Sequence, residues 1–282
     1  MPPVRTLVQT LIAATTATGT AVALAPAAHA SNIPVACSEN ALVTAVNLAN
    51  STAAADTLVL ASGCTYSITS PHGGLTNGLP VITTPIEMLG PATITRSSLQ
   101  TFRLIEVSAT GRLTLTTGVA LTNGSAVGDG GAILNRGAVT LTRSSLSGNF
   151  ATGNGGGLAN ADTPSGTAPA ATFTRSPVSG NTSLLRGGGI YNGLRGTLTT
   201  TGVSGSPMFV QGNTGSQGGG IAAINSTATT LTQTAVTTNH AVLTAGGVYR
   251  VGGTMTTTNS PISANTPNNC VGSAPAVPNC TG

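Results

Sequence analysis

The chain has 282 residues and a formal net charge of +4, yet only 6% of its residues are charged and 2% are aromatic. It contains no lysine, and its ten arginines are scattered along the sequence. Nucleic-acid sites combine a basic stripe with stacking aromatics, so this composition excludes a nucleic-acid partner. Thr, Ser, Asn and Gly supply the polar surface, which indicates a β-rich extracellular protein.

Residues 1–30 have the features of a secretory signal peptide. Arg5 is the only charge ahead of the apolar run TLIAATTATGTAVALA, and the small-residue phrase AHA predicts cleavage after Ala30. The apolar run is short and interrupted by Thr, so we do not expect it to remain as a membrane span, and no second apolar span follows. Lipidation of Cys37, within IPVAC, is the alternative.

The segment after the leader predicts a single helix over residues 39–50, with Ser38 placed to cap its N-terminus. The apolar residues expected on its buried face are Ala41, Leu42, Ala45, Val46 and Leu48. Because repeat arrays expose apolar core at their ends, we assign residues 31–66 to an N-terminal cap.

Residues 67–265 contain an internal repeat whose interval takes one of two lengths, a shorter and a longer one. Five units combine an Asn, a run of small residues ending in Gly-Gly, an aliphatic residue and a Thr-rich phrase such as GTLTTT at Gly196. The recurring asparagines are Asn123, Asn149, Asn181, Asn213, Asn239 and Asn265. The longer intervals carry extra residues, such as ADTPSGTAPA from Ala161, which stacked repeats tolerate.

Each unit predicts short strands separated by turns, without an amphipathic helix. The shorter interval, such as that from Asn213 to Asn239, cannot hold a four-stranded propeller blade but has room for three short strands. Stacking such units gives an all-β solenoid, a parallel β-helix whose neighbouring strands lie about 4.8 Å apart. The aliphatic residues would then fill the interior, and the asparagine amides would stack into one ladder at a turn.

Glycine runs such as GNTSLLRGGGIYNG, from Gly180, raise the question of a phosphate site. A P-loop requires a lysine, which this chain lacks, and a dinucleotide fingerprint must open a helix. Thr-rich, strand-forming sequence follows Gly189 instead. We therefore interpret the glycines as a corner of each coil, where positive φ or close approach is needed, and expect no cofactor.

The four cysteines flank the repeat, two at each end: Cys37, Cys64, Cys270 and Cys280. Export favours disulfides, and four cysteines allow three pairings. Because the ends of a rod lie far apart, we prefer Cys37–Cys64 and Cys270–Cys280, the second within a C-terminal cap over residues 266–282. The spacings match neither a zinc site nor a redox motif, so we expect no metal.

The phrase NALVTAVNLANS, followed by ADTLVLASGCTYSIT, resembles the opening of secreted bacterial right-handed parallel β-helix proteins with the pectin-lyase-like fold. The repeats GGGIYNGLRGTLTTT and GGAILNRGAVTLTRSSLSGN look like those of polymorphic outer-membrane and choice-of-anchor-type surface proteins. The resemblance covers most of residues 37–265 and implies a right-handed coil. It leaves function open, since this fold hosts both enzymes and inert scaffolds.

An enzyme on this fold needs grouped carboxylates, as in the pectate lyases and polygalacturonase-like hydrolases that the chain resembles in fold. Glu106 and Asp129 are separated in the sequence by nearly one repeat, so they would lie about one coil apart. Arginines that could lie beside them are Arg103, Arg112 and Arg136. The ordinary interpretation assigns Asp129 to a Gly-rich turn and Glu106 to an ion pair, since adjacent acids alone rarely make a site.

Glycan binding is the second class of function, because solenoids offer long faces and sugars stack on aromatic rings. Tyr191 and Tyr249 occupy equivalent repeat positions, two coils apart, with Ala222 between them. Neither His72 nor His240 has an acid or nucleophile beside it in the sequence, so we interpret both as loop or surface residues.

We therefore expect a secreted, non-catalytic β-helix scaffold at the cell surface or in the extracellular space. Cell-wall or extracellular glycans are the partners that fit this expectation. The alternatives are a polysaccharide lyase or glycoside hydrolase on the pectin-lyase-like fold, and a glycan-binding module.

Overall fold

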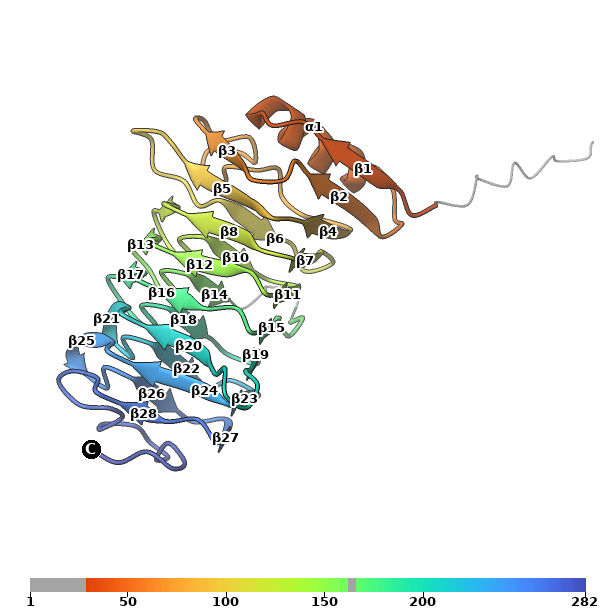
Figure 1. Cartoon of the computed structure of the whole chain (residues 1–282). Coiled ribbons are helices and arrows are strands. Elements are labelled where there is room, and N and C mark those ends of the chain that lie inside the picture. The colour runs from red at the N-terminus through yellow and green to blue at the C-terminus, as the bar shows by residue number, and fades with distance from the viewer. Residues whose placement is uncertain (1–28, 162–165) are drawn as a thin grey trace, which may run out of the picture.

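The computed structural model describes residues 29–161 and 166–282 as a parallel β-solenoid of about eight turns with one helix (Figure 1). The all-β solenoid predicted from the repeat is thus confirmed, whereas the handedness of its coil stays a prediction. The proposed leader lies outside the described residues except for its last two, His29 and Ala30.

Each full coil contributes one strand to each of four sheets, here named sheets A to D in the order in which the chain visits them. Sheet A contains β1 (Asn32–Val35), β2 (Asp56–Leu60), β4 (Pro85–Leu89), β7 (Arg112–Thr116), β11 (Ala138–Thr142), β15 (Ala170–Thr174), β19 (Thr197–Thr201), β23 (Ala228–Thr232) and β27 (Thr254–Thr258). Sheet B contains β3 (Cys64–Ile68), β5 (Ala92–Arg96), β8 (Val119–Thr122), β12 (Ser145–Ser147), β16 (Val178–Ser179), β20 (Met208–Gln211), β24 (Thr234–Thr237) and β28 (Ile262–Ser263).

The two remaining sheets complete the coil. Sheet C contains β9 (Ser125–Ala126), β13 (Phe150–Ala151), β17 (Thr182–Ser183), β21 (Thr214–Gln217) and β25 (His240–Thr244). Sheet D contains β6 (Ile105–Val107), β10 (Ile133–Asn135), β14 (Leu158–Asn160), β18 (Ile190–Asn192), β22 (Ile221–Ile224) and β26 (Val248–Val251). The Thr-rich phrases of the repeat all fall in sheet A and the aliphatic residues after Gly-Gly in sheet D.

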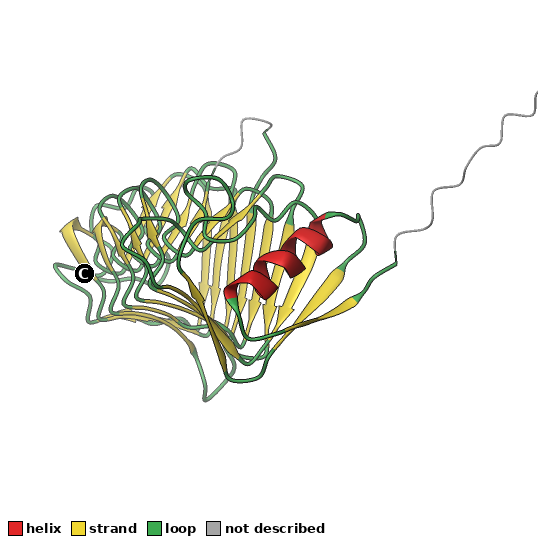
Figure 2. Ribbon diagram, turned by 90° about the horizontal axis from the view of Figure 1, so that it is seen from above, coloured by secondary structure: helices red, strands yellow, loops and turns green. Residues whose placement is uncertain are grey.

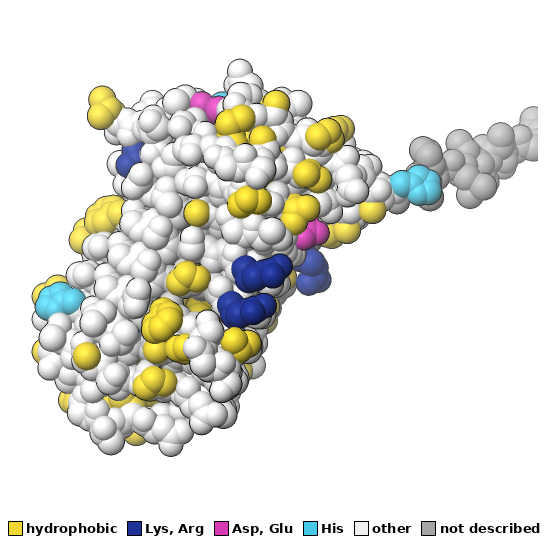
Figure 3. All heavy atoms as spheres, in the orientation of Figure 1, with side chains coloured by type: hydrophobic (Ala, Val, Ile, Leu, Met, Phe, Trp, Pro, Cys, Tyr) yellow, Lys and Arg dark blue, Asp and Glu magenta, His cyan; other side chains and the backbone are white. Residues whose placement is uncertain are grey.

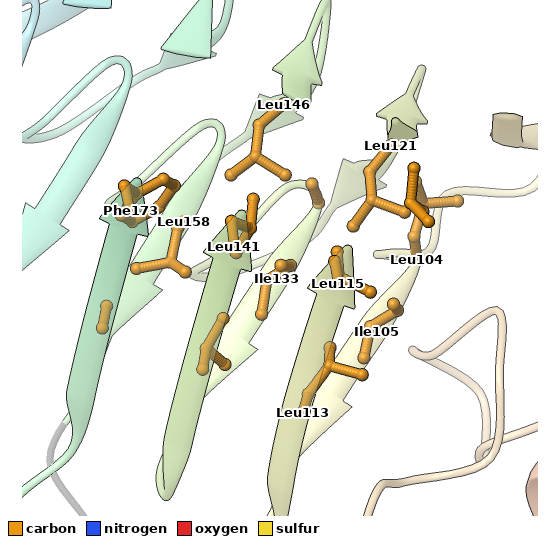
Figure 4. Close-up of a cluster of buried hydrophobic side chains, with 14 of the residues drawn as sticks. Leu104, Ile105, Leu113, Leu115, Leu121, Ile133, Leu141, Leu146, Leu158 and Phe173 are labelled. Atoms are coloured by element: carbon orange, nitrogen blue, oxygen red, sulfur yellow. The ribbon is translucent and has the colours of Figure 1, made fainter. Parts of the chain in front are cut away.

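Alternation along the strands creates the core. In β11 the side chains of Val139 and Leu141 point inward and are buried, while their neighbours face outward. Figure 4 shows Leu113 and Leu115 of sheet A meeting the aliphatic side chains of sheet D, Ile105 and Ile133 among them, across the interior. Burial of this continuous aliphatic column is the main favourable term for folding.

The predicted helix is α1 (Glu39–Asn50), which lies across the N-terminal end of the coil (Figure 2). The Ser38 hydroxyl accepts a hydrogen bond from the backbone N–H of Ala41, as expected for an N-cap. The buried face consists of Leu42, Ala45, Val46 and Ala49. Placing Leu48 on that face was wrong, because its side chain is 55% exposed and Ala49, one position further along, packs inward instead.

The N-terminal region combines a cap with the first coil. Strand β1 precedes α1 and pairs with β2 at the edge of sheet A. Strands β2 and β3 already belong to sheets A and B, so the solenoid begins at Asp56, within the range assigned to the cap. The disulfide Cys37–Cys64, one of the two expected, joins the segment before α1 to the start of β3.

The C-terminal residues cover the last coil. The Thr257 hydroxyl donates a hydrogen bond to the carbonyl of Pro278, at 2.9 Å, and Arg250 Nη1 donates to the carbonyl of Ala276, at 3.0 Å. The second expected disulfide, Cys270–Cys280, closes this segment. The open end of the solenoid is thereby covered by chain that follows the repeats.

Asparagines line the corner between sheets B and C in a buried ladder. In each step the backbone N–H and the side-chain Nδ2 both donate to the Oδ1 of the next Asn, at 2.9–3.0 Å for Asn181 and Asn213. The ladder consists of Asn149, Asn181, Asn213, Asn239, Asn265 and Asn269. Asn269, from the C-terminal cap, completes it although it belongs to no repeat.

Including Asn123 in this ladder was wrong. Its side chain is exposed, and its φ of 59° places it one residue earlier in the coil, at the position that Gly148 and Gly180 occupy. Gly124 takes the ladder position and donates its N–H to Asn149 Oδ1 at 2.9 Å. The left-handed corner favours Asn or Gly, which explains why an Asn stands there.

The glycine runs form the corner between sheets C and D, as the sequence predicts. Gly187 has a φ of 66°, and Gly188 lies where two coils approach closely. A Cβ on Gly188 would lie 2.3 Å from the carbonyl oxygen of Thr214 and 2.4 Å from that of Gly219. Only glycine fits this close approach, so the run is a packing requirement of the solenoid.

A second asparagine ladder, at the end of sheet D, was not anticipated. Asn135 Nδ2 donates to Asn160 Oδ1 at 2.7 Å, and Asn160 Nδ2 donates to Asn192 Oδ1 at 3.1 Å. Asn192 then donates to the hydroxyl of Thr229 at 2.9 Å. The phrases ILN, LAN and IYN, each placing Asn two residues after the aliphatic residue, were the available signal.

Candidate functional site

Glu106 lies in β6 with its carboxylate facing outward, since its two strand neighbours point into the core. Its Oε2 accepts a hydrogen bond from Asn77 Nδ2 at 3.0 Å and lies 3.6 Å from Arg103 Nη1. Its Oε1 lies 3.3 Å from Arg136 Nε, which donates to it. Both carboxylate oxygens are therefore held by donors from three neighbouring residues.

Arg103 is the buried centre of this cluster, with a side chain that is 7% exposed. Its Nη1 donates to Asn77 Oδ1 at 2.6 Å, and its Nε donates to the carbonyl of Asp129 at 3.3 Å. Burial lowers the pKa of Arg103, while the carboxylate of Glu106 opposes that shift. A guanidinium stays protonated in proteins, so Arg103 acts as a fixed cation.

Asp129 does not face Glu106 as a catalytic partner. Its Oδ1 accepts hydrogen bonds from the backbone N–H of Asn154, at 2.6 Å, and from Asn154 Nδ2, at 3.1 Å. The two acids lie in successive coils but not in register with each other. Glu106 pairs with Leu134 of the next coil, whereas Asp129 comes earlier in that coil, at the corner before Gly130.

Of the three arginines that the sequence offered as neighbours of Glu106, Arg103 and Arg136 lie beside it. Arg112 lies elsewhere, on sheet A. It lines a hollow on the outside of sheet A with Asp56 and Glu87. Asp56 Oδ1 accepts a hydrogen bond from the backbone N–H of Ser31 at 2.8 Å, and Glu87 Oε1 accepts one from the hydroxyl of Thr116 at 2.8 Å. These acids are thus also engaged in holding the first coils together.

His72 meets an acid that the sequence did not place beside it. Its Nε2 lies 2.7 Å from Glu39 Oε1, at the start of α1, and 3.5 Å from the Ser70 hydroxyl. A nucleophile–His–acid triad requires the acid and the nucleophile on different ring nitrogens. Here Glu39 and Ser70 both contact Nε2, so the three residues are not arranged for nucleophilic catalysis. Their contacts join the N-terminal cap to the loop after β3.

His240 and the tyrosines lie on the outer surface. His240 Nδ1 lies 2.9 Å from the hydroxyl of Thr266, in the C-terminal cap. Tyr191 and Tyr249 share one column of sheet D with Ala222 between them, as predicted. Both rings are half-buried, and that of Tyr191 packs against a small apolar cluster around Leu134. Tyr191 therefore already covers protein surface.

Figure 3 shows few charged side chains on this face, where arginine side chains gather beside an acidic one and most of the remaining surface is neutral. Within residues 29–161 and 166–282, no three His, Cys, Asp or Glu side chains gather as metal ligands. In the same part of the chain, no helix is long and apolar enough to cross a membrane. No protein-family model matches the sequence, and no curated protein matches it.

Proposed function

We propose that this protein is a secreted, non-catalytic β-helix scaffold of the cell surface or extracellular space. The observation that carries the proposal is the engagement of both Glu106 oxygens by Asn77, Arg103 and Arg136. General acid–base chemistry on a polysaccharide needs a carboxyl group that can reach the substrate and exchange a proton. A carboxylate held on both sides by cations and an amide is suited to joining coils.

Export is part of this proposal and is supported by the two disulfides, which persist in oxidising compartments. The finer assignment, to right-handed bacterial proteins of the pectin-lyase-like fold, rests on the helix, DTLVL and GCTY motifs. N-terminal sequencing of exported protein should begin at Ser31. A chain that retained the leader, or that carried lipid on Cys37, would contradict this processing.

The activity test uses the exported protein with pectate, polygalacturonate, alginate and chondroitin, with and without calcium. We expect no release of unsaturated or reducing ends. Turnover that disappeared in Glu106→Gln but persisted in Glu87→Gln would establish the lyase or hydrolase alternative. Glu87 is the matched control because it is an outward acid in a different sheet.

A glycan-binding role is the second candidate, favoured by the shared column of Tyr191 and Tyr249. Aromatic rings two coils apart lie about 9.6 Å from one another, twice the strand spacing. Retention on cell-wall polysaccharide should then weaken in Tyr249→Ala. Equal retention of the wild type and this variant would remove the observation that favours the role.

A further inference from the structure

The outer face of sheet A carries two complete columns of threonine. In six consecutive coils, from β7 to β27, the third and fifth strand residues are both Thr and both face outward. The first column is Thr114, Thr140, Thr172, Thr199, Thr230 and Thr256. The second is Thr116, Thr142, Thr174, Thr201, Thr232 and Thr258. We call these twelve residues the threonine face.

The threonine face is a regular two-dimensional array. All five residues of each strand pair in register with the next strand from β7 to β27. Figure 1 shows these strands stacked one below another along one side of the solenoid. Neighbours within a column are therefore about 4.8 Å apart, and the two columns are separated by two strand residues, about 6.6 Å.

The hydroxyls of this array are available to solvent. Thr116 donates to Glu87 at 2.8 Å. In residues 29–161 and 166–282, none of the other hydroxyls in the two columns has a hydrogen-bond partner, and all their side chains are half-buried or exposed. Thr is stiff at χ1, so each residue holds its methyl and hydroxyl in a restricted orientation. The array thus presents ordered donors and acceptors.

No charged residue stands within the two columns, although the exposed Arg143 and Arg175 directly follow Thr142 and Thr174 at the margin of the second column. The remaining outward positions of the strands from β11 to β27 are Ala138, Ala170, Thr197, Ala228 and Thr254. Arg112 and Glu87 mark the edge where the regular surface ends.

Strand propensity by itself does not explain this regularity. Sheet B has the same number of coils in this part of the solenoid, and its outward residues include Ala120, Ser147, Phe209 and Gln211. They differ in size and in hydrogen-bonding groups from one coil to the next. The uniform face is therefore specific to sheet A.

A rigid array with two fixed repeats matches a ligand that itself repeats in two directions. Crystalline polysaccharides are flat ligands of this kind, but sugar faces bind aromatic rings, which the threonine face lacks. Ice also repeats in two directions, with oxygen atoms at comparable intervals on its prism faces. Hydroxyls bond to water, and methyl groups restrict the orientation of the water beside them.

We propose that the threonine face adsorbs to ice, holding a layer of ordered water between its hydroxyls and the crystal. Adsorption requires no charge and no pocket, because water-mediated hydrogen bonds replace direct contacts. This activity goes beyond the scaffold role and does not depend on the Glu106 cluster. The two proposals can therefore fail separately.

The test measures partition of the purified protein into a growing ice shell and inhibition of ice recrystallisation. We expect the wild type to do both. Thr199→Tyr, at the centre of the face, should lose both activities because its ring holds the crystal away from neighbouring hydroxyls. Thr172→Tyr, one coil away, serves as a second variant. Ser147→Tyr places the same ring outward on sheet B and should retain both activities.

Thermal melts must show that each variant compared is folded, and Thr199→Val provides a milder change if the tyrosine variants are unstable. A folded wild type that is excluded from ice would overturn the proposal. Equal activity of the wild type, Thr199→Tyr and Thr172→Tyr would also overturn it. Retention on crystalline cellulose or chitin that depends on Thr199, without any effect on ice, would assign the face to polysaccharide instead.

Discussion

Single residues hold the corners of this solenoid, and the asparagine ladder shows how. Asn213, for example, accepts two hydrogen bonds on Oδ1 from Asn181, the preceding ladder residue, and donates its Nδ2 to the carbonyl of Val178. No other side chain of that size supplies an acceptor and two donors in one plane. The ladder therefore satisfies backbone groups that the turn leaves unpaired.

Replacing Asn181 by Leu should destabilise the fold. The backbone N–H of Asn149 would lose its acceptor, whereas its Nδ2 would keep the carbonyls of Leu121 and Ser147. A buried group left unpaired costs about 1–3 kcal/mol, so urea or thermal melts should show a reduced free energy of unfolding. Asn123→Gly is the control, because Asn123 lies on the left-handed corner outside the ladder. A loss as large in the control would contradict the register described here.

The close approach of neighbouring coils at Gly188 leads to a second prediction about a single residue. Gly188→Ala would place a methyl group 2.3 Å from the Thr214 carbonyl oxygen. Overpacking of this kind costs about 1–3 kcal/mol, measurable as a lower midpoint of urea unfolding. Gly148→Asn should be tolerated, because the left-handed corner accepts Asn. A Cβ added at Gly148 would have its nearest neighbour, Asn123 Oδ1, at 3.8 Å.

The elements at the two ends differ from the coils between them, because they must cover apolar core. Helix α1 does so at the N-terminus and is tied to the loop after β3 by Glu39. Burial opposes ionisation of this carboxyl, but hydrogen bonds from Thr69, Ser70 and His72 outweigh it and lower the pKa of Glu39.

This shift makes the N-terminal cap sensitive to acid. A carboxyl whose folded pKa is lowered adds stability above its unfolded pKa and loses it as the pH falls through the folded value. Urea midpoints of the wild type should therefore exceed those of Glu39→Gln at neutral pH, and the difference should shrink as both proteins are acidified. A difference independent of pH would show that ionisation of Glu39 contributes nothing.

The two disulfides should contribute unequally. Cys37–Cys64 spans 27 residues and Cys270–Cys280 spans 10, so the first removes more conformational freedom from the unfolded chain. Replacing the first pair by Ser should cost about 2–4 kcal/mol, and replacing the second pair should cost less. Melts of the two double variants under identical conditions provide the comparison.

At the scale of the whole molecule, each coil contacts mainly its neighbours, so the exposed ends decide whether the solenoid stays a single particle. Deletion of residues 266–282 would uncover the edges of β25 to β28 and remove Asn269 from the ladder. Unpaired strand edges pair with other chains. The truncated protein should therefore show a mass that rises with concentration by light scattering, while the full chain shows a constant mass.

Much of this architecture could be predicted from the sequence because its determinants are local and repeated. The helix over residues 39–50, the Thr-rich strands of sheet A and the glycine corner each follow from a short pattern. Repetition then places equivalent residues above one another, which is why the column of Tyr191 and Tyr249 was predictable.

Register and contact between distant segments depended on the tertiary structure. Asn123 falls outside the ladder because Thr122 pairs with Ser147, which places Gly124 and not Asn123 beside Asn149. The coil that starts at Glu106 comes back into register only at Leu134, so it is longer than the interval from Glu106 to Asp129. The sequence by itself determined the fold and its repeating elements, because alternation and turn chemistry act over a few residues. The tertiary structure decided which acids meet which arginines and which hydroxyls remain unpaired, because these depend on the exact length of every coil.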